Sequence, residues 1–456
     1  MADWRDQKYT EVFGETLNGL QRRHAVDPAF SIEDVENQLV HLYVLDGNDW
    51  LGRGVLGDIV SEATIAAYEL FIEEWKIEKG EKMAVEIRKV ESQRDLKRFI
   101  DFPVHLYWDQ PNYVPAPRFD EMRTLSKDKN AAFEFCEAEY WTAWKDDKIV
   151  GRIAGIINHR FIEKWEREWG RFGWIDFIDD ADVSAALLGT VEKWAASKGM
   201  KALHGPLGFT DLDREGMLVE GFDECATLAT IYNYPYYPQH LEMLGYRKDV
   251  DWLQFQIFTP KEIPEKVQHV ADLIAKRSGV HLFVWKDKRV IVEKFGKELF
   301  ALIDETYGDL YGTTPLSERQ VEDYIKQYLG FVEPRFTKIL VDKDEHLIGF
   351  GIAMPSLSEA FYKSRGRLFP AGWYYVLKAL KNPKVLDLYL VAVRPEYQSR
   401  GVLALVMNEL QRSAMDAGIE YAETNLELED NIKVQSIWKD YPKRQHKRSR
   451  AYIKEI

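Results

Sequence analysis

From residue 388 to residue 439 the chain reads LYLVAVRPEYQSRGVLALVMNELQRSAMDAGIEYAETNLELEDNIKVQSIWK. The first six residues are apolar or aromatic and predict a strand, which Pro395 ends because the residue before a proline avoids helical dihedral angles. Apolar residues then recur at helical spacing over 402–414, and Gly418 stands where a left-handed cap would end that helix. A second strand is predicted at 421–426. This order of strand, loop, helix and strand indicates half of an α/β domain.

The loop between the first strand and the helix has the features of an anion site. The start of a helix presents unpaired N–H groups, and Gly401 lets a ligand come close to the main chain. An alternative stays open, in which Gly401 only relieves a tight turn and the loop binds nothing. The residues expected to hold a diphosphate are Gln398, Ser399, Arg400, Gly401, Val402 and Leu403.

These residues resemble the pyrophosphate loop of the GNAT superfamily of N-acyltransferases, which reads Gln/Arg-x-x-Gly-x-Gly/Ala after a strand carrying Val-x-Pro. Gln398, Arg400 and Gly401 match the pattern, whereas Leu403 stands where the family has Gly or Ala. The resemblance implies acyl-CoA as co-substrate. It also implies that the N–H group of Val391 or Val393 polarises the thioester.

The resemblance further implies that Asn431 bonds the pantetheine arm, although Asn431 also fits as the cap of a helix over 432–438. For the catalytic base we expect Glu423. Asp213 and Glu215, across the cleft, are expected to hold a cationic amine or to serve as the base instead of Glu423. Tyr441 is the candidate acid. Each carboxylate also fits a purely structural role.

An internal repeat organises the chain. The hairpin pattern of 145–151 recurs at 343–349, and the preceding residues 1–80 carry three helical patterns. We therefore expect a mixed α/β (α+β) protein with a small helical domain at 1–80, a degenerate GNAT-like lobe at 83–260 and a GNAT lobe with the acyl-CoA loop at 261–456. In the first lobe, acidic residues at 179–182 would repel a diphosphate at the start of the corresponding helix.

The second lobe also contains an apolar and aromatic insertion at 367–380. This insertion is either ordinary core or a cover over an acyl or lipid groove. Residues 83–456 as a whole resemble a two-lobed branch that we associate with bacterial ceramide synthases, which transfer a fatty acyl group to the amine of a sphingoid base. That resemblance implies a lipid acceptor.

Composition excludes several classes of function. A net charge of −14 argues against general binding of nucleic acid, which needs a basic surface. No apolar run reaches the roughly 18 residues of a membrane span, and no signal peptide is recognised, so we expect a cytoplasmic protein. Cys136 and Cys225 have no partner spacing, and no metal site is expected. The basic run 443–450 predicts a solvated loop, a contact with the anionic inner membrane, or a contact with cofactor phosphates.

Together these patterns predict an N-acyltransferase that moves an acyl group from acyl-CoA, or from an acyl carrier protein, to an amine. A sphingoid-base lipid is the finer expectation for the acceptor. Two alternatives remain: a non-catalytic acyl-CoA-binding or scaffold protein, and a transferase acting on an amino-acid or peptide amine.

Overall fold

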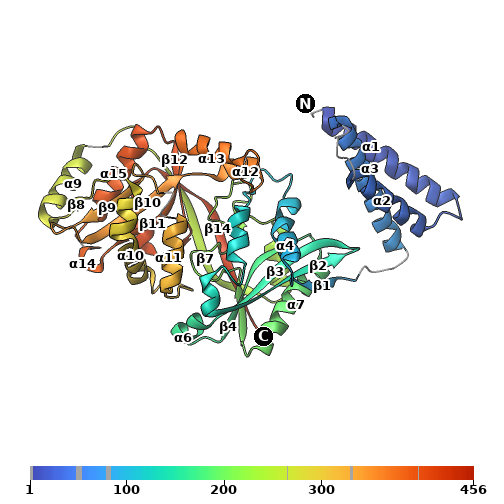
Figure 1. Ribbon diagram of the computed structural model, residues 1–456, viewed down its shortest axis with the longest axis horizontal. Helices are drawn as coiled ribbons and strands as arrows, with labels where there is room; N and C mark the ends of the chain where they lie inside the picture. Colours follow the sequence, from blue (N-terminus) through green and yellow to red (C-terminus); the bar gives the residue numbers. More distant parts are fainter. Residues whose placement is uncertain (1–3, 48–53, 79–83, 264, 329–331, 399) are drawn as a thin grey trace. The chain divides into compact units, whose positions relative to one another are not determined.

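The computed structural model describes residues 4–47, 54–78, 84–263, 265–328, 332–398 and 400–456. The chain forms two compact units, Met1–Ala84 and Val85–Ile456 (Figure 1). Since the second unit is continuous, the division into lobes at 83–260 and 261–456 stays a prediction. We keep the names first lobe and second lobe for the two halves of the repeat.

The first unit is helical, as predicted. It contains α1 (Trp4–Val26), α2 (Ile32–Gly47) and α3 (Gly54–Glu78). At the start of α2, Ser31 and Asp34 cap one another's backbone N–H groups, each at 3.2 Å. The helices pack around a small core of Leu20, Phe30, Val35, Leu39, Phe71, Ile72 and Trp75.

The second unit is built on one large mixed sheet. Its strand order is β1-β2-β3-β4-β5-β14-β7-β12-β11-β10-β9-β8, with β6 beside β14 and β13 beside β7. The strands are β1 (Glu86–Lys89), β2 (Cys136–Lys145), β3 (Lys148–Asn158), β4 (Trp169–Phe177), β5 (Ala202–Gly205), β6 (Met217–Glu220), β7 (Arg247–Phe258), β8 (His281–Leu282), β9 (Thr337–Val341), β10 (Leu347–Pro355), β11 (Val385–Val393), β12 (Tyr421–Thr424), β13 (Glu427–Leu428) and β14 (Lys443–Glu455).

Helices surround this sheet, and two of them are equivalent in the repeat. They are α7 (Ala181–Ser197), which connects β4 to β5, and α15 (Leu403–Asp416), which connects β11 to β12; both strand pairs are parallel. The others are α4 (Gln93–Leu106), α5 (Arg118–Thr124), α6 (His159–Trp165), α8 (Tyr236–Met243), α9 (Glu265–Ser278), α10 (Lys288–Tyr307), α11 (Glu318–Tyr328), α12 (Ser358–Ser364), α13 (Gly372–Lys381), α14 (Pro395–Gln398) and α16 (Ile432–Ile437).

The apolar spacing that predicts α15 is also what buries it. Val402, Val406 and Leu410 lie in one core cluster with Leu340 of β9 and Ile348 of β10. Gly418, just after the helix, has φ +68°, as a left-handed cap requires. In the first lobe α7 presents Leu187, Val191 and neighbouring residues to an equivalent cluster under the sheet. The predicted mixed α/β architecture is confirmed.

The two lobes exchange their last strands. The strand that ends the first lobe, β7, pairs with β12 of the second lobe, and the strand that ends the second lobe, β14, pairs with β5 of the first. The exchanged strands β7 and β14 also pair with each other over most of their length (Figure 1). The sheet is therefore continuous across the seam between the lobes.

The prediction of a basic loop at 443–450 is wrong, because these residues form the first part of β14. Several of its basic side chains have partners within the protein. Arg448 and Arg450 bind Asp251 of β7, Arg444 binds Glu224, and Lys447 is only 3% exposed and donates to the carbonyl of Cys225. Arg444, Arg448 and Arg450 therefore have carboxylate partners within the protein, and a contact of this run with an anionic membrane or with cofactor phosphates stays a prediction.

Asp251 is the most buried charge of this seam, at 1% exposure. Its carboxylate accepts hydrogen bonds from Arg450 at 2.7 and 3.0 Å and from Arg448 at 3.1 Å, and Lys248 lies 3.1 Å away. Burial opposes its ionisation, but the bonds from Arg450 and Lys248 hold the pKa of Asp251 below its usual value.

No helix in the described part of the chain combines the length and the apolar character needed to cross a membrane.

We predict that Asp251→Ala lowers the free energy of unfolding by about 3–5 kcal/mol, because it leaves cations buried at the seam without their counter-ion. Chemical denaturation of the full chain measures this. The matched control is Glu455→Ala, which removes the exposed Arg247–Glu455 pair between the same two strands and should change stability little. Equal effects of the two substitutions would contradict the central role of Asp251.

Candidate active site in the second lobe

The sheet opens between β11 and β12. These parallel strands pair from Val385–Tyr421 to Leu388–Thr424, and the N–H of Asn425 makes the last bond, 3.2 Å to the carbonyl of Leu388. The chain then turns to β13, which pairs with β7, while β11 continues to Val393 against β10. Residues 389–393 of β11 therefore lose their neighbour on one side. Ligands in open α/β sheets bind at such carboxyl ends of parallel strands.

Tyr307, the last residue of α10, fills part of this opening. Its hydroxyl donates to the carbonyl of Val391 at 2.9 Å, and the N–H of Val391 donates to the same hydroxyl at 3.3 Å. Burial raises the pKa of Tyr307 to about 12, with Glu427 and Asp211 adding to the effect. The Val391 N–H predicted from the sequence as a donor to the thioester is thus held by a phenol that stays protonated at neutral pH.

Glu427 of β13 is the carboxylate associated with this opening. The indole Nε1 of Trp438 donates to its Oε1 at 2.7 Å, and its buried Oε2 has no hydrogen-bond partner among the described residues. Burial raises the pKa of Glu427 to about 7. A carboxyl group with this pKa exchanges protons readily at neutral pH. The sequence alone does not point to Glu427, because it is one of several acidic residues between 423 and 430 and no motif singles it out.

The predicted diphosphate loop follows β11. Gln398 donates from Nε2 to the carbonyl of Val393 at 3.0 Å, which ties the loop to the strand. Gly401 has φ +73°, a conformation that favours glycine. Arg400 is exposed and lies over the ring of Tyr397, and Val402 is fully buried. Ser399 lies outside the described residues.

The start of α15 fits an anionic group. No side-chain hydrogen bond caps this helix at Val402, so its first N–H groups have no side-chain acceptor there. A Cβ atom at Gly401 would lie 3.2 Å from Ile274 and would crowd the turn. Leu403 is half-buried against the core of the second lobe. The residues present therefore fit the diphosphate of an acyl-CoA.

Three other predicted site residues have structural partners. Asn431 caps α16 by accepting a hydrogen bond from the N–H of Val434 at 3.3 Å. Tyr441 packs edge-on against Trp438. Glu423 is 6% exposed and lies 2.7 Å from both Gln256 Nε2 and His446 Nε2, within the seam. Roles for them in binding or catalysis stay predictions.

The acidic loop of the first lobe does reach the second lobe. Leu212 packs against the cluster that contains Tyr307 and Tyr389. Asp213, however, accepts the backbone N–H groups of Phe209 and Thr210 at 2.8 and 3.1 Å, so it shapes its own loop.

Burial affects the protonation of both predicted acids of this loop. It raises the pKa of Asp213 to about 7 and raises that of Glu215 as well, with Asp211 adding to the effect on Glu215. Roles for Asp213 and Glu215 in holding an amine stay predictions.

The first lobe lacks the corresponding anion loop. Asp180 accepts the N–H groups of Asp182 and Val183 at 2.9 and 3.2 Å and binds Lys145. As predicted, acidic side chains thus satisfy the start of α7 themselves.

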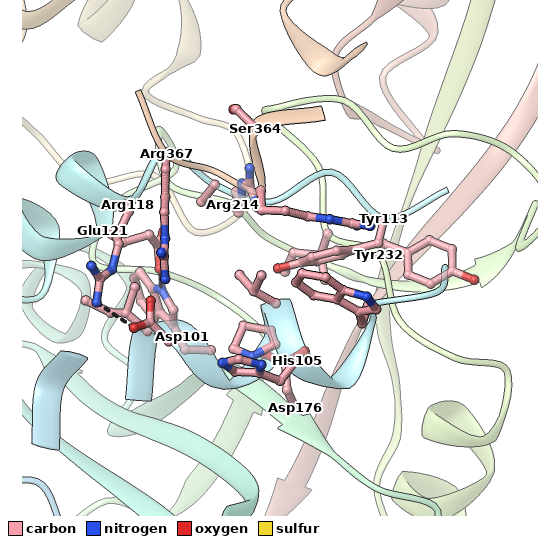
Figure 2. A pocket seen from close by; sticks show the side chains of 18 of the residues that line it. Asp101, His105, Tyr113, Arg118, Glu121, Asp176, Arg214, Tyr232, Ser364 and Arg367 are labelled. Carbon is pink, nitrogen blue, oxygen red and sulfur yellow. Dashed lines mark hydrogen bonds and ion pairs between the residues drawn. The ribbon is translucent and has the colours of Figure 1, made fainter. Parts of the chain in front are cut away.

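A cavity of about 550 Å³ lies instead mainly among residues of the first lobe, and residues of the second lobe border it (Figure 2). Its walls come from α4, β4 and the loops before and after β6, and residues between 363 and 375, which include the first part of the insertion at 367–380, border it. Of the two interpretations of the insertion, ordinary core or a cover over a groove, this position favours the cover. None of the site residues predicted from the sequence lines the cavity, because its walls come from segments far apart in the chain.

Asp342, Asp344 and His346 form a cluster that could hold a metal, with ligand atoms within 4.8 Å of one another. They lie in the turn between β9 and β10, where Asp342 accepts the N–H groups of Asp344 and His346 at 2.9 Å. These hydrogen bonds within the turn explain why the three side chains lie close together without a metal.

Comparison with known proteins gives two relatives. No family model matches the chain. Protein YghO of Escherichia coli (strain K12) is 30% identical over 383 residues, which cover 81% of this chain and 95% of that protein. Bacterial ceramide synthase of Caulobacter vibrioides (strain NA1000 / CB15N) is 27% identical over 383 residues, covering 80% and 96%.

Solved structures show weaker likeness. A tandem GNAT protein from the clavulanic acid biosynthesis pathway has a TM-score of 0.46 at 12% identity, covering 81% of this chain and 98% of that one. A GCN5-related N-acetyltransferase from Sphaerobacter thermophilus has a TM-score of 0.44 at 13% identity, covering 81% and 95%.

The relation to Protein YghO spans nearly all of that protein and most of this chain. The chain therefore belongs to the family of Protein YghO.

Proposed function

We propose that the protein transfers an acyl group from acyl-CoA to the amine of a long-chain lipid, in the opening between β11 and β12. The observation that carries the proposal is this opening, followed directly by the Gly401 turn and the uncapped start of α15. β11 offers strand backbone for an acyl thioester, at Val391 in exchange for the bonds to Tyr307, and the start of α15 offers N–H groups for the diphosphate.

The acyl-CoA supplies a thioester carbonyl and a thiolate leaving group. The N–H of Val391 would donate to the carbonyl oxygen once the Tyr307 hydroxyl gives up that bond. Glu427 would accept the proton that the attacking amine loses, because its unpartnered Oε2 can take it. Tyr307, which is protonated at neutral pH in the resting protein, would give its proton to the sulfur as the C–S bond breaks. The proton held by Glu427 would then restore the phenol.

One observation supports a lipid acceptor. A relative that matches 80% of this chain is named a bacterial ceramide synthase. We therefore propose a sphingoid base as the acceptor class. The alternatives of an amino-acid or peptide amine, an acyl carrier protein as donor, and a non-catalytic acyl-CoA-binding protein become outcomes of the test.

The test is mass spectrometry of products after the full chain is given acetyl-CoA, palmitoyl-CoA or palmitoyl acyl carrier protein, each with a sphingoid base, an amino acid or a short peptide. We expect amide product from the long-chain donor and the sphingoid base. Product from the amino acid or peptide alone would replace the lipid proposal. Tight CoA binding with no product from any amine would identify a binding protein.

We predict that Gly401→Ala raises the KM for acyl-CoA by about tenfold with a smaller effect on kcat. A side chain at φ +73° costs roughly 1–2 kcal/mol and crowds Ile274, which would shift the loop. The matched control is Gly418→Ala, which has φ +68° and no atom within 4 Å of its new Cβ. It carries the same backbone strain away from the loop, so an equal rise in KM would count against a diphosphate site.

We predict that kcat/KM rises with pH and levels off above about 7, because Glu427 accepts a proton only when it is ionised. Glu427→Gln should lower kcat by about 10²–10⁴-fold and remove this pH dependence. A pH–rate profile of each variant measures both effects.

The substitution Glu427→Gln should leave the protein folded. The folded-state pKa is raised, so the folded protein favours the neutral form and loses stability as pH rises from about 4.5 to about 7. Asp430→Asn, an exposed change three residues away, is the control. A fully active Glu427→Gln with an inactive Glu423→Gln would assign the base to Glu423 instead.

A further inference from the structure

The cavity of the first lobe contains charged groups that acyl transfer in the second lobe does not use. Six Arg or Lys side chains line it, against three carboxylates. Two of the carboxylates are already neutralised, since Asp101 binds Arg118 and Asp176 binds Arg152. The third, Glu121, accepts a hydrogen bond from the indole of Trp174 at 2.8 Å. An excess of positive charge therefore remains around the cavity.

Hydrogen-bond donors around the cavity lack acceptors. Arg118 Nε, Arg214 Nη2 and Ser364 Oγ are buried and have no partner among the described residues. The hydrogen bond seen for Arg214 in the described part of the chain runs from its Nε to the carbonyl of Leu228 at 2.7 Å. Burying donors without acceptors is costly, and an oxygen-rich anion would satisfy them.

Figure 2 shows Arg118, Arg214, Ser364 and Arg367 around the same space. They come from separate segments: Arg118 from the start of α5, Arg214 from the loop before β6, and the other two from the end of α12 and the connection that follows it. Arg367 is exposed, and no ion pair involving its side chain is seen within the described ranges. A charged group entering the cavity would therefore meet Arg367 at its rim.

The rest of the lining is mostly apolar. Trp108, Ile231 and Phe369 line the cavity, and Phe369 is 78% exposed although it belongs to the insertion that borders the space. A volume of about 550 Å³ falls within the usual range for small-molecule sites. Uncompensated donors beside an apolar space favour a ligand with one charged end and one apolar end.

We propose that this cavity binds an amphipathic anion. The carboxylate or phosphate head would lie among Arg118, Arg214 and Ser364, with Arg367 closing over it, and the apolar chain would pack against Trp108, Ile231 and Phe369. This site goes beyond the proposed acyl transfer and does not depend on it. A cationic amphiphile would place its charge beside guanidinium groups and should be rejected.

The test is isothermal titration of the full chain with three probes of equal chain length below their micelle concentrations: dodecanoate, dodecyl phosphate and dodecyltrimethylammonium. We expect both anions to bind at least tenfold more tightly than the cation, and the stronger of the two anions identifies the head group. Arg214→Met and Arg367→Met should each weaken anion binding by about ten- to a hundredfold. Arg289→Met, which removes an exposed arginine paired with Asp287, is the control.

Thermal unfolding of each variant checks folding. Arg367→Met tests the head-group site even if Arg214→Met fails to fold, because Arg367 is exposed. Equal binding of the cation, or unchanged anion binding in Arg367→Met, would overturn the proposal. Amide formation measured on the same variants separates the two ideas, since loss of anion binding with normal acyl transfer would leave the proposed function standing.

Discussion

The pairing of β7 with β14 is the interaction on which the second unit depends. Each strand ends one lobe and completes the sheet of the other, so every long-range strand contact between the lobes passes through this pair. Backbone hydrogen bonds alone would leave the register weakly specified. Asp251 specifies it, because its buried carboxylate accepts the side chains of Arg448 and Arg450, which lie two residues apart on the facing strand.

The pairing of β7 with β14 also determines where each lobe's sheet leaves a strand without a neighbour. Each lobe contains a parallel strand pair whose second strand, β5 or β12, is held by an exchanged strand. Because β12 is fixed against β7, the chain after Thr424 follows β7 as β13, and β11 is left uncovered beside Tyr307 and Glu427. The first lobe uses the same plan differently. Its helix start is filled by Asp180, and its cavity is lined by arginines and aromatic residues.

Much of the fold could be predicted from local patterns. The helix from 403 to 416 follows from apolar spacing, and Gly418 and Gly401 both take the left-handed conformation that their positions require. The start of β14 could not be predicted, since its basic residues have partners far away in the chain. Arg444 pairs with Glu224, and Arg448 and Arg450 pair with Asp251. The strand forms there because tertiary ion pairs replace the usual apolar alternation.

The candidate site could also be predicted only where its residues have a local sequence signature. The loop at 398–403 has a local signature, so its place after β11 was found. Glu427 has none, because Glu423 is equally buried and only the partner of Glu427, the indole of Trp438, distinguishes the two. The arginine-lined cavity likewise depends on packing between segments that no local pattern connects.

The exchange of last strands has a consequence for how such a chain can be assembled. A single lobe made alone would lack the neighbour of its final strand and would expose an unpaired sheet edge. Two such lobes on separate chains would complete each other as a swapped dimer, whose folding would depend on protein concentration. Joining both copies in one chain removes that dependence, so the second unit can form its full sheet at any dilution.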